Sequence, residues 1–250
     1  MKVCVIGNGG REHAIAWRLS ISPSVEKVYA VPGSAAMKNC AELVGIDWSH
    51  TDHLIRFLKD NKVDLVVVGP EAPLVAGLAD ALHEAGIPVF GPSKAAAQFE
   101  GSKVFAKDFM KKYNIPTAAY GVFSNVDEAK QFIAKTGAPI VVKADGLAAG
   151  KGVVVAMTVE EANAAVDDML SGNRFGEAGS TVVIEEFMAG EEASLLAFVD
   201  GKTVVPMIAS QDHKRIFDGD KGPNTGGMGT YAPAPVLTDA LRDEAMKTIL

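Results

Sequence analysis

Lys143 is the residue whose setting in this sequence points most directly to chemistry. It lies in the apolar run IVVKA, and burying a lysine there is costly unless its charge meets an anion. The small-residue stretch DGLAAGKG follows at once. It fails the Walker A pattern, because only three residues separate Gly146 from Gly150 and because Gly152 follows Lys151. A loop of this composition between two strands instead suggests a flap that folds over a triphosphate.

The acidic stretch VIEEFMAGEE adds the other parts of a nucleotide site. Glu185 to Phe187 end a predicted strand, so their backbone could offer a donor and an acceptor to an adenine edge. Glu192 comes seven positions after Glu185 and could accept hydrogen bonds from ribose hydroxyls. A solvated acidic turn is a reasonable alternative for Glu186 and Glu191, but it explains the whole arrangement less well.

The glycine-rich turn GNGGRE near the start of the chain resembles a phosphate cradle. Gly7 and Gly9 match the first two glycines of the dinucleotide fingerprint G-x-G-x-x-G, but Glu12 occupies the last position. The next predicted strand ends in VPG, without an acid to hold ribose hydroxyls. Both departures disfavour the alternative of a nicotinamide-dependent oxidoreductase. The turn suits a single phosphate at a helix N-terminus, or a tight turn in which the glycines serve packing alone.

A fourth segment, SQDHKRIFDGDKGPNTGGMGTYAPAP (210–235), is glycine-rich and has too little apolar content for a core element. It carries Asp212, His213, Lys214 and Arg215 in one run. Loops of this kind usually bind a ligand or move, so we expect a functional loop. A lone histidine is more often structural than catalytic, and no role is assigned to His213.

The elements that must position these residues fall into two regions. Before residue 101, short Val- and Ile-rich strands alternate with helices. The predicted strands are 2–7, 27–31, 64–69 and 87–91, and the predicted helices are 11–20, 52–61 after a Thr51 cap, and 73–85. This alternation predicts a parallel sheet with crossover helices, whose ligands bind beyond the carboxyl ends of the strands. The turns GNGGRE, GPEAPL and FGPS would lie there.

After residue 101 the pattern changes to a two-layer α+β arrangement with an antiparallel sheet. Helices are expected to open at Ser102, Ser124 and Thr158, the last with a capping box. The expected strands are 138–146, 152–158 and 180–188, followed by a hairpin over 193–210 with its turn at Asp200 and Gly201. The final helix has no C-cap signal, so we expect the chain to stop inside a domain.

Composition excludes several classes of protein. The formal net charge of −7 over 250 residues leaves no basic excess for general nucleic-acid binding. No apolar run approaches the roughly 20 residues of a membrane span, and the chain enters a strand directly after Met1, without a signal peptide. Cys4 and Cys40 are the only cysteines, too few for a disulfide framework or a metal cluster. We therefore expect a cytoplasmic protein that binds neither nucleic acid nor membrane.

Taken together, several motifs resemble those of the phosphoribosylamine–glycine ligases, ATP-grasp enzymes of purine biosynthesis. The similarity runs in order over all 250 residues and includes GNGGREHA, GPEAPLV, EGSK, KADGLAAGKGV, IEEFMAGEEAS, SQDHKR and GPNTGGMGTYAPAP. It implies an α/β and α+β fold. A Rossmann-like parallel-sheet domain (1–101) would precede an ATP-grasp flap domain (102–190) and the start of a larger, incomplete ATP-grasp domain (191–250).

The resemblance also implies a reaction. ATP would phosphorylate the carboxylate of glycine to a glycyl phosphate, and the amine of 5-phosphoribosylamine would displace phosphate to give glycinamide ribonucleotide. Positioning and charge neutralisation would supply most of the catalysis. The implied cofactors are ATP with Mg²⁺ or Mn²⁺, and the partners are the two small substrates; the oligomeric state is left open. The alternatives are an inactive ATP-binding fragment of this enzyme and another ATP-grasp carboxylate–amine ligase.

Individual roles carry over by position. The resemblance assigns nucleotide contacts to Lys103, Lys143, Gly146, Gly150, Lys151, Gly152, Glu185, Phe187 and Glu192. It assigns catalytic roles to Lys143, Asp212 and Lys214. Substrate contacts fall on Gly9, Gly10, Arg11, Glu12, Pro70, Glu71, Asn224, Thr225, Gly226, Gly227, Met228 and Gly229. The turns before residue 72 would face phosphoribosylamine, and the residues after 211 would line the glycine and γ-phosphate side. No metal ligand is assigned, because the family's metal ligands are expected beyond residue 250.

Overall fold

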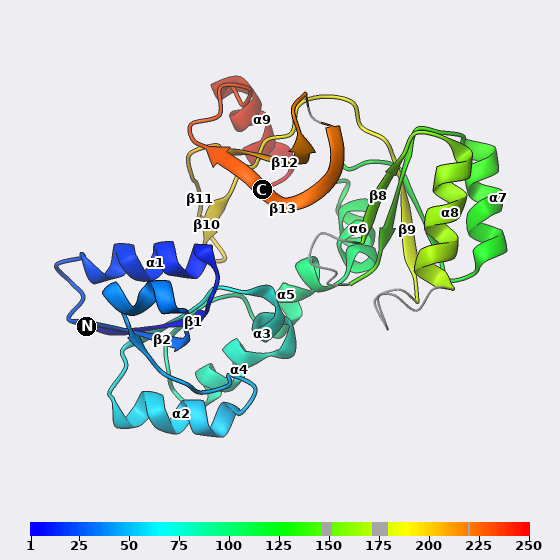
Figure 1. Ribbon diagram of the computed structural model, residues 1–250. Coiled ribbons are helices and arrows are strands. Elements are labelled where there is room, and N and C mark those ends of the chain that lie inside the picture. Colours follow the sequence, from blue (N-terminus) through cyan, green and yellow to red (C-terminus); the bar gives the residue numbers. More distant parts are fainter. Residues whose placement is uncertain (147–151, 172–179, 220) are drawn as a thin grey trace. The chain divides into compact units, whose positions relative to one another are not determined.

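The computed structural model describes residues 1–146, 152–171, 180–219 and 221–250. The chain divides into two compact units, Met1–Gly101 and Ser102–Leu250 (Figure 1). Gly150 and Lys151, predicted to belong to the flap, lie outside the described residues. Among the described helices, none is both long and apolar enough to cross a membrane.

The first unit is built on a five-stranded parallel sheet in the order β3-β2-β1-β4-β5. Its strands are β1 (Lys2–Gly7), β2 (Lys27–Pro32), β3 (Glu42–Leu43), β4 (Leu65–Val68) and β5 (Val89–Phe90). The predicted parallel sheet is confirmed. The strand order reverses between β1 and β4, which pair directly with each other, and ligands of such sheets bind at this reversal.

Helices lie between these strands and after the last of them. They are α1 (Gly10–Ser20), the 3₁₀ helix η1 (Ala35–Asn39), α2 (Thr51–Asp60), α3 (Glu71–Ala76), α4 (Leu78–Glu84) and α5 (Lys94–Gly101). The prediction of one helix over 73–85 is wrong, because Gly77 adopts a φ of +98° and separates α3 from α4. Thr51 is the first residue of α2 and not its cap; His50 holds that position.

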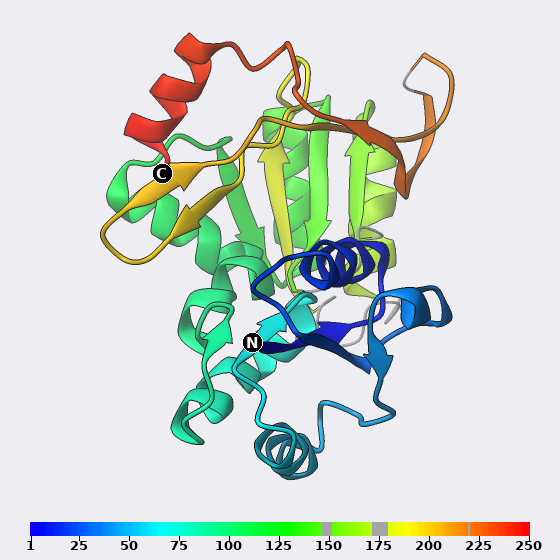
Figure 2. The ribbon, with the colours of Figure 1, turned by 90° about the vertical axis from the view of Figure 1, so that its left-hand side faces the viewer.

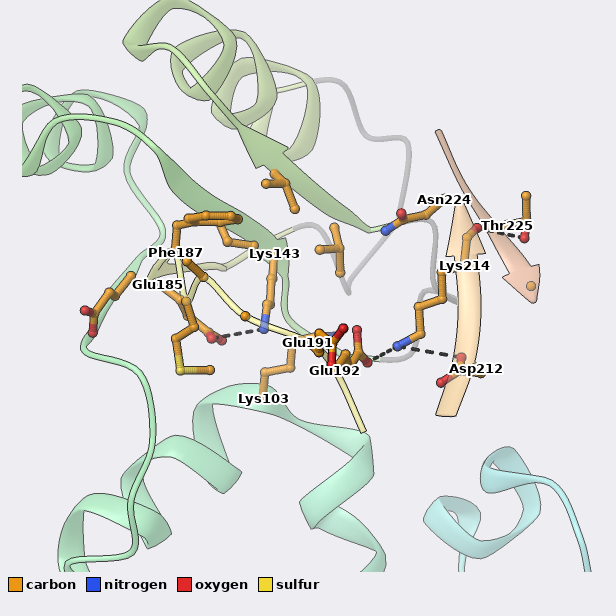
Figure 3. Close-up of a pocket in the computed structure, with 18 residues that line it drawn as sticks. Lys103, Lys143, Glu185, Phe187, Glu191, Glu192, Asp212, Lys214, Asn224 and Thr225 are labelled. Atoms are coloured by element: carbon orange, nitrogen blue, oxygen red, sulfur yellow. Dashed lines mark hydrogen bonds and ion pairs between the residues drawn. The ribbon is translucent and has the colours of Figure 1, made fainter. Parts of the chain in front are cut away.

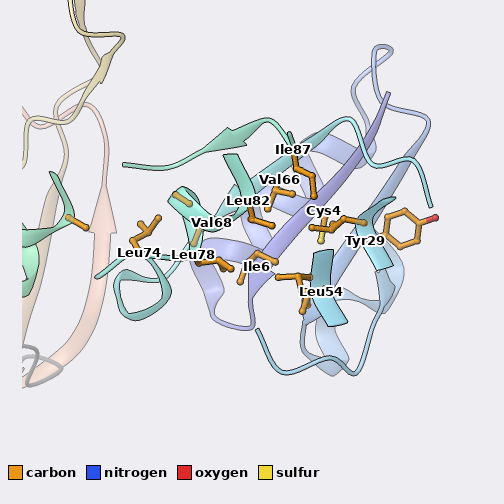
Figure 4. Packing of buried hydrophobic residues seen from close by; sticks show 14 residues of the cluster. Cys4, Ile6, Tyr29, Leu54, Val66, Val68, Leu74, Leu78, Leu82 and Ile87 are labelled. Atoms are coloured by element: carbon orange, nitrogen blue, oxygen red, sulfur yellow. The ribbon is translucent and has the colours of Figure 1, made fainter. Parts of the chain in front are cut away.

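The two faces of β1 pack against separate clusters of buried side chains. Cys4 and Ile6 join Leu54, Val66 and Leu82 on one face (Figure 4). The alternate residues of β1 join the other cluster, which also contains Ala30 and Met37. A strand buried on both faces is typical of a parallel sheet covered by helices. Cys4 is fully buried in the core, and burial raises the pKa of its thiol to about 12.

The second unit contains a four-stranded antiparallel sheet in the order β6-β9-β7-β8. The strands are β6 (Tyr120–Phe123), β7 (Ile140–Ala144), β8 (Val153–Ala156) and β9 (Val182–Glu186), and the neighbouring helices are α6 (Lys103–Tyr113), α7 (Val126–Thr136) and α8 (Val159–Leu170). Helices α7 and α8 lie side by side along the sheet (Figure 1). Ile133, Ile140, Val166 and Ile184 form part of the core between them.

Side-chain acceptors mark the starts of these helices. Ser102 caps α6 by accepting from the Phe105 amide, and Thr158 caps α8 by accepting from the Glu161 amide, both as predicted. The prediction that Ser124 opens α7 is wrong by one residue. The Asn125 carboxamide oxygen accepts from the first amides of that helix, whereas the Ser124 hydroxyl is paired with the Thr181 hydroxyl at 2.9 Å.

The remaining residues form two strand pairs and a helix (Figure 2). Strands β10 (Ala197–Val199) and β11 (Val204–Pro206) make the predicted hairpin, with Gly201 at a φ of +90° in its turn. The prediction that residues 210–235 form a loop is wrong. Strands β12 (Gln211–Phe217) and β13 (Lys221–Tyr231) pair there in antiparallel fashion. Register shifts along this pair break the alternation that identifies a strand in a sequence. Helix α9 (Asp239–Thr248) follows.

Candidate functional site

A cavity of about 990 Å³ opens in the second unit (Figure 3). Residues of β7, β8, β9, β12 and β13 line it, together with the first residue of α6 and the segment after β9. The volume is within the range of small-molecule sites. Among the residues predicted for nucleotide or substrate, the cavity brings together Lys103, Lys143, Glu185, Phe187, Glu192, Asp212, Lys214, Asn224, Thr225 and Gly226.

One wall of the cavity is apolar and is formed by two neighbouring strands. Val141 of β7 and Val153 and Val155 of β8 supply it. Alternation along a strand places every second side chain on the same face. Lys143 follows Val141 at this spacing and lines the same cavity, which puts an ammonium beside the apolar wall.

A cluster of three charged side chains, two of them buried, lies beside this wall. The Lys143 Nζ is 3.0 Å from the Glu185 Oε2, and the Lys107 Nζ is 3.1 Å from the same oxygen. The anion that Lys143 meets in the structure is the carboxylate of Glu185, and the expected contact of Lys143 with a phosphate stays a prediction. Lys107 was not predicted from the sequence. The available signal was its spacing four residues after Lys103, which places both lysines on one side of α6.

The two ends of the predicted flap are held by hydrogen bonds. The Lys103 Nζ donates to the Gly146 carbonyl at 2.9 Å, and the Ala144 amide donates to the Gly152 carbonyl at 2.8 Å. Asp145 accepts from the Ser102 hydroxyl and from the Val104 amide at 3.2 Å. These contacts join the start of α6 to the end of β7, so Lys103 and Lys143 are positioned together.

Glu185 reaches the cavity through its side chain. In β9 it pairs with Tyr120 on one side and with Val141 on the other. The next amide, that of Glu186, donates to the Ala119 carbonyl at 2.8 Å. Backbone groups free of the sheet begin after Glu186, and Phe187 lines the cavity there.

A second charged group lies on the side of the cavity formed by β12. The Lys214 ammonium forms an ion pair with the Glu192 carboxylate and is 3.8 Å from the Asp212 Oδ2 (Figure 3). The Thr225 hydroxyl of β13 donates to the Lys214 carbonyl at 2.9 Å, which ties the two strands together. Gly227, Met228 and Gly229 lie further along β13 and are not among the lining residues.

The predicted substrate residues of the first unit come from two turns at the strand-order reversal. Gly9, Gly10, Arg11 and Glu12 follow β1, and Pro70 and Glu71 follow β4. The Arg11 guanidinium joins the turns, because it is 3.0 Å from the Glu12 carboxylate and 3.1 Å from that of Glu71. Burial lowers the pKa of Arg11, but the hydrogen bonds to both carboxylates outweigh it and raise that pKa overall.

Glu12 explains the departure of this turn from the dinucleotide fingerprint. Its side chain is buried, and its Oε2 accepts from the Gly9 amide at 2.8 Å. A Cβ atom at Gly7 or Gly69 would lie only 2.5 Å or 2.3 Å from the Glu12 Cγ. Glu12 thus fills the turn from inside and occupies one of its amides, which leaves Arg11 and Glu71 as the more exposed charged groups.

The described residues contain no group of three or more His, Cys, Asp or Glu side chains that could hold a metal ion. Phosphoryl transfer from ATP ordinarily uses a divalent cation that bridges the phosphates. Of the acidic side chains that line the cavity, Glu185 and Glu192 are paired with lysines. These residues therefore do not fit a metal ion by themselves.

Comparison with known proteins decides the family. The models that match this chain describe phosphoribosylglycinamide synthetase, with its N domain over residues 1–100 and its ATP-grasp (A) domain over residues 101–250. The chain belongs to the phosphoribosylamine–glycine ligase family. One such ligase, from Halalkalibacterium halodurans, is 58% identical over 250 residues. The alignment covers 100% of this chain and 58% of that relative, so the chain spans well under two thirds of its length.

Solved structures agree with this assignment. A crystal structure of a phosphoribosylamine–glycine ligase from Thermotoga maritima has a TM-score of 0.83 at 36% identity, covering 99% of this chain and 60% of the other. The biotin carboxylase domain of a 2-oxoglutarate carboxylase from Hydrogenobacter thermophilus, solved with MgADP and bicarbonate, has a TM-score of 0.75 at 17% identity. It covers 99% of this chain and 56% of that chain, and shows a shared fold alone.

Proposed function

We propose that this protein takes part in the ATP-dependent joining of glycine to 5-phosphoribosylamine through a glycyl phosphate, which yields glycinamide ribonucleotide, ADP and phosphate. Family membership supports the proposal. The observation that carries it is the cavity in which Lys103 and Lys143 lie beside an apolar wall, with Asp212 and Lys214 on another side. Such a site pairs cations for phosphates with an apolar surface for a base.

The nucleotide would occupy the part of the cavity between β7, β8 and the end of β9. Lys103 and Lys143 would hold phosphates, and the flap residues Gly146, Gly150, Lys151 and Gly152 would cover them. The backbone at Phe187 would meet the adenine edge, and Glu192 would accept from the ribose. The ion pair between Glu192 and Lys214 would have to open for that contact.

The two substrates would bind to different groups of residues. Asp212 and Lys214 with the residues from Asn224 to Gly229 would line the glycine and γ-phosphate side. Gly9, Gly10, Arg11, Glu12, Pro70 and Glu71 would form the phosphoribosylamine site, with Glu12 acting through the shape of its turn. We further propose that residues 102–190 form the flap domain and that residues 191–250 belong to a larger domain.

We also propose which metal ion accompanies ATP and where the protein works. ATP would bind with Mg²⁺ or Mn²⁺, and the protein would work in the cytoplasm without nucleic-acid or membrane partners. Cys4 and Cys40 are both free thiols, which fits a reducing compartment.

ADP release from Mg-ATP tests the function, with glycine and 5-phosphoribosylamine omitted in turn. Release that needs both substrates supports the ligase, and release with a different acid or amine contradicts the assigned substrates. Lys143→Ala is expected to abolish turnover while the fold persists. Lys130→Ala is the matched control, because Lys130 forms a partly exposed ion pair with Asp167 on α7 and α8.

A second candidate function is ATP binding without turnover. The observation that favours it is that the described residues supply Lys103 and Lys143 for phosphates but no group of acidic side chains that could hold a metal ion. It predicts saturable ATP binding and no ADP release under any combination of substrates. Equilibrium titration with ATP beside the turnover assay separates the two candidates.

A further inference from the structure

We propose that Lys107 is a positioning residue of the nucleotide site, which acts on Lys143 through the shared carboxylate of Glu185. The inference rests on the proposed binding of a nucleotide in the cavity. Lys107 is absent from the residues that line this cavity, so its influence has to pass through another side chain.

The Lys107 ammonium is held in one place by three contacts. Its side chain is 8% exposed and its Nζ is 3.1 Å from the Glu185 Oε2. The same nitrogen donates to the Thr117 hydroxyl at 2.8 Å and to the Ala118 carbonyl at 3.2 Å. An ammonium group has three N–H donors, and these partners use all of them. Lys107 is therefore a fixed positive charge beside the cavity and not a ligand for its contents.

The Glu185 carboxylate forms ion pairs with two lysines. Its side chain is 7% exposed, and its Oε2 contacts both the Lys107 and the Lys143 ammonium groups. Lys143 is 27% exposed and lines the cavity. Glu185 thus links a buried cation to one that a ligand can reach.

Counting charges shows what Lys107 contributes. Two ammonium groups and one carboxylate leave a net charge of +1 in the cluster. Without Lys107, Glu185 would neutralise Lys143 alone, and this cluster would present no net charge to an anion. A lone carboxylate would also hold Lys143 more tightly. Lys107 therefore keeps Lys143 available to a phosphate group.

Equilibrium titration with ATP tests the inference in four proteins. Lys107→Met keeps the length of the side chain and removes its charge, and we expect it to weaken ATP binding about ten- to a hundred-fold, the range for a hydrogen bond to a charged group. Lys107→Arg keeps the charge and should recover most of the affinity. Lys130→Met removes a lysine from a partly exposed ion pair and should bind ATP like the unmodified protein.

The same substitution made in a Glu185→Gln protein tests whether Lys107 acts through Glu185. It also covers the case in which Lys107→Met alone does not fold. In the Glu185→Gln protein no carboxylate neutralises Lys143, so adding Lys107→Met should weaken ATP binding much less than it does in the unmodified background. Equal losses of ATP affinity in both backgrounds would overturn the inference. Unchanged affinity in Lys107→Met would overturn it too, and so would a Lys107→Arg protein that does not recover binding. No ATP binding by the unmodified protein would overturn the nucleotide site itself, and the inference with it.

Discussion

At the scale of single residues, buried charges organise the two candidate sites. Glu12 fills the turn after β1, and Glu185 joins two lysines beside the cavity. In both cases a residue that was predicted to contact a ligand has a largely buried carboxylate, and donors of the protein satisfy it. Burial of a carboxylate is tolerated only with such partners, so these side chains shape their sites from within.

The close packing around Glu12 predicts the outcome of a small substitution. In Gly69→Ala the new methyl group would overlap the buried Glu12 side chain, and overpacking of this kind costs about 1–3 kcal/mol. The free energy of unfolding in urea measures it. The same substitution in a Glu12→Ala background should cost much less. Gly10→Ala is the control, because its Cβ would meet nothing within 4 Å; equal losses in both backgrounds would contradict the packing argument.

Glu71 predicts how stability depends on acid. Burial raises the pKa of Glu71, but a backbone hydrogen bond and Arg11 outweigh it, so the folded-state pKa lies below the ordinary value. Its contribution to stability is therefore present above the unfolded pKa of about 4.3 and is lost as pH falls through the lower folded value. When the pH is lowered from 7 to acid values, the free energy of unfolding should decrease less in Glu71→Gln than in the unmodified protein.

Urea midpoints at neutral and acid pH test this expectation. Glu84→Gln, at an exposed position at the end of α4, should retain the acid dependence of the unmodified protein. The same acid dependence in Glu71→Gln would show that the pair with Arg11 makes no difference.

At the scale of elements, helix starts depend on which oxygen reaches the free amides. In α7 the Asn125 side chain accepts from the Asp127 amide at 2.9 Å and from the Glu128 amide at 3.1 Å. Ser124 and Asn125 are both good N-cap residues, so local preference did not separate them. The tertiary structure separates them, because the Ser124 hydroxyl is hydrogen-bonded to the Thr181 hydroxyl and Asn125 caps the helix.

This arrangement predicts a difference between two variants of one position. Asn125→Ala should destabilise the protein by about 1 kcal/mol, because two amides of α7 lose their acceptor. Asn125→Asp keeps an acceptor oxygen and places a negative charge at the helix N-terminus, so it should be near neutral. Thermal or urea unfolding measures both. Equal stability of the two variants would show that Asn125 does not cap α7.

At the scale of the whole molecule, buried apolar side chains are unevenly distributed. The large, fully buried side chains lie in the first unit and in residues 133–184. After residue 190, Ala234 is the only hydrophobic residue of the described chain that is buried, while Phe198, Ile208 and Phe217 are more than half exposed. Few buried apolar contacts imply a low free energy of local opening.

Hydrogen exchange should therefore divide the chain at about this point. We expect backbone amides of β1, β7 and β9 to exchange slowest and those of β10 to β13 to exchange early. Mass spectrometry of peptic fragments measures the difference. Equal protection of β12 and β1 would mean that strand pairing alone, without a core, stabilises the later region.

Much of the fold follows from local patterns. The parallel sheet of the first unit, the caps at Ser102 and Thr158 and the hairpin around Gly201 were predicted, because alternation, capping and turn preferences act over a few residues. Motifs in the sequence also indicated the family, and the apolar neighbours of Lys143 indicated that its ammonium needs an anionic partner.

The tertiary structure alone decided which distant groups meet. Lys107 and Glu185 are 78 positions apart, so no local pattern could indicate their pairing. The same holds for the Glu12 side chain beneath Gly69 and for the pairing of β12 with β13, whose register shifts conceal it. Periodicity and capping describe interactions between near neighbours, whereas a buried ion pair or a strand pair depends on segments that only the folded chain brings together.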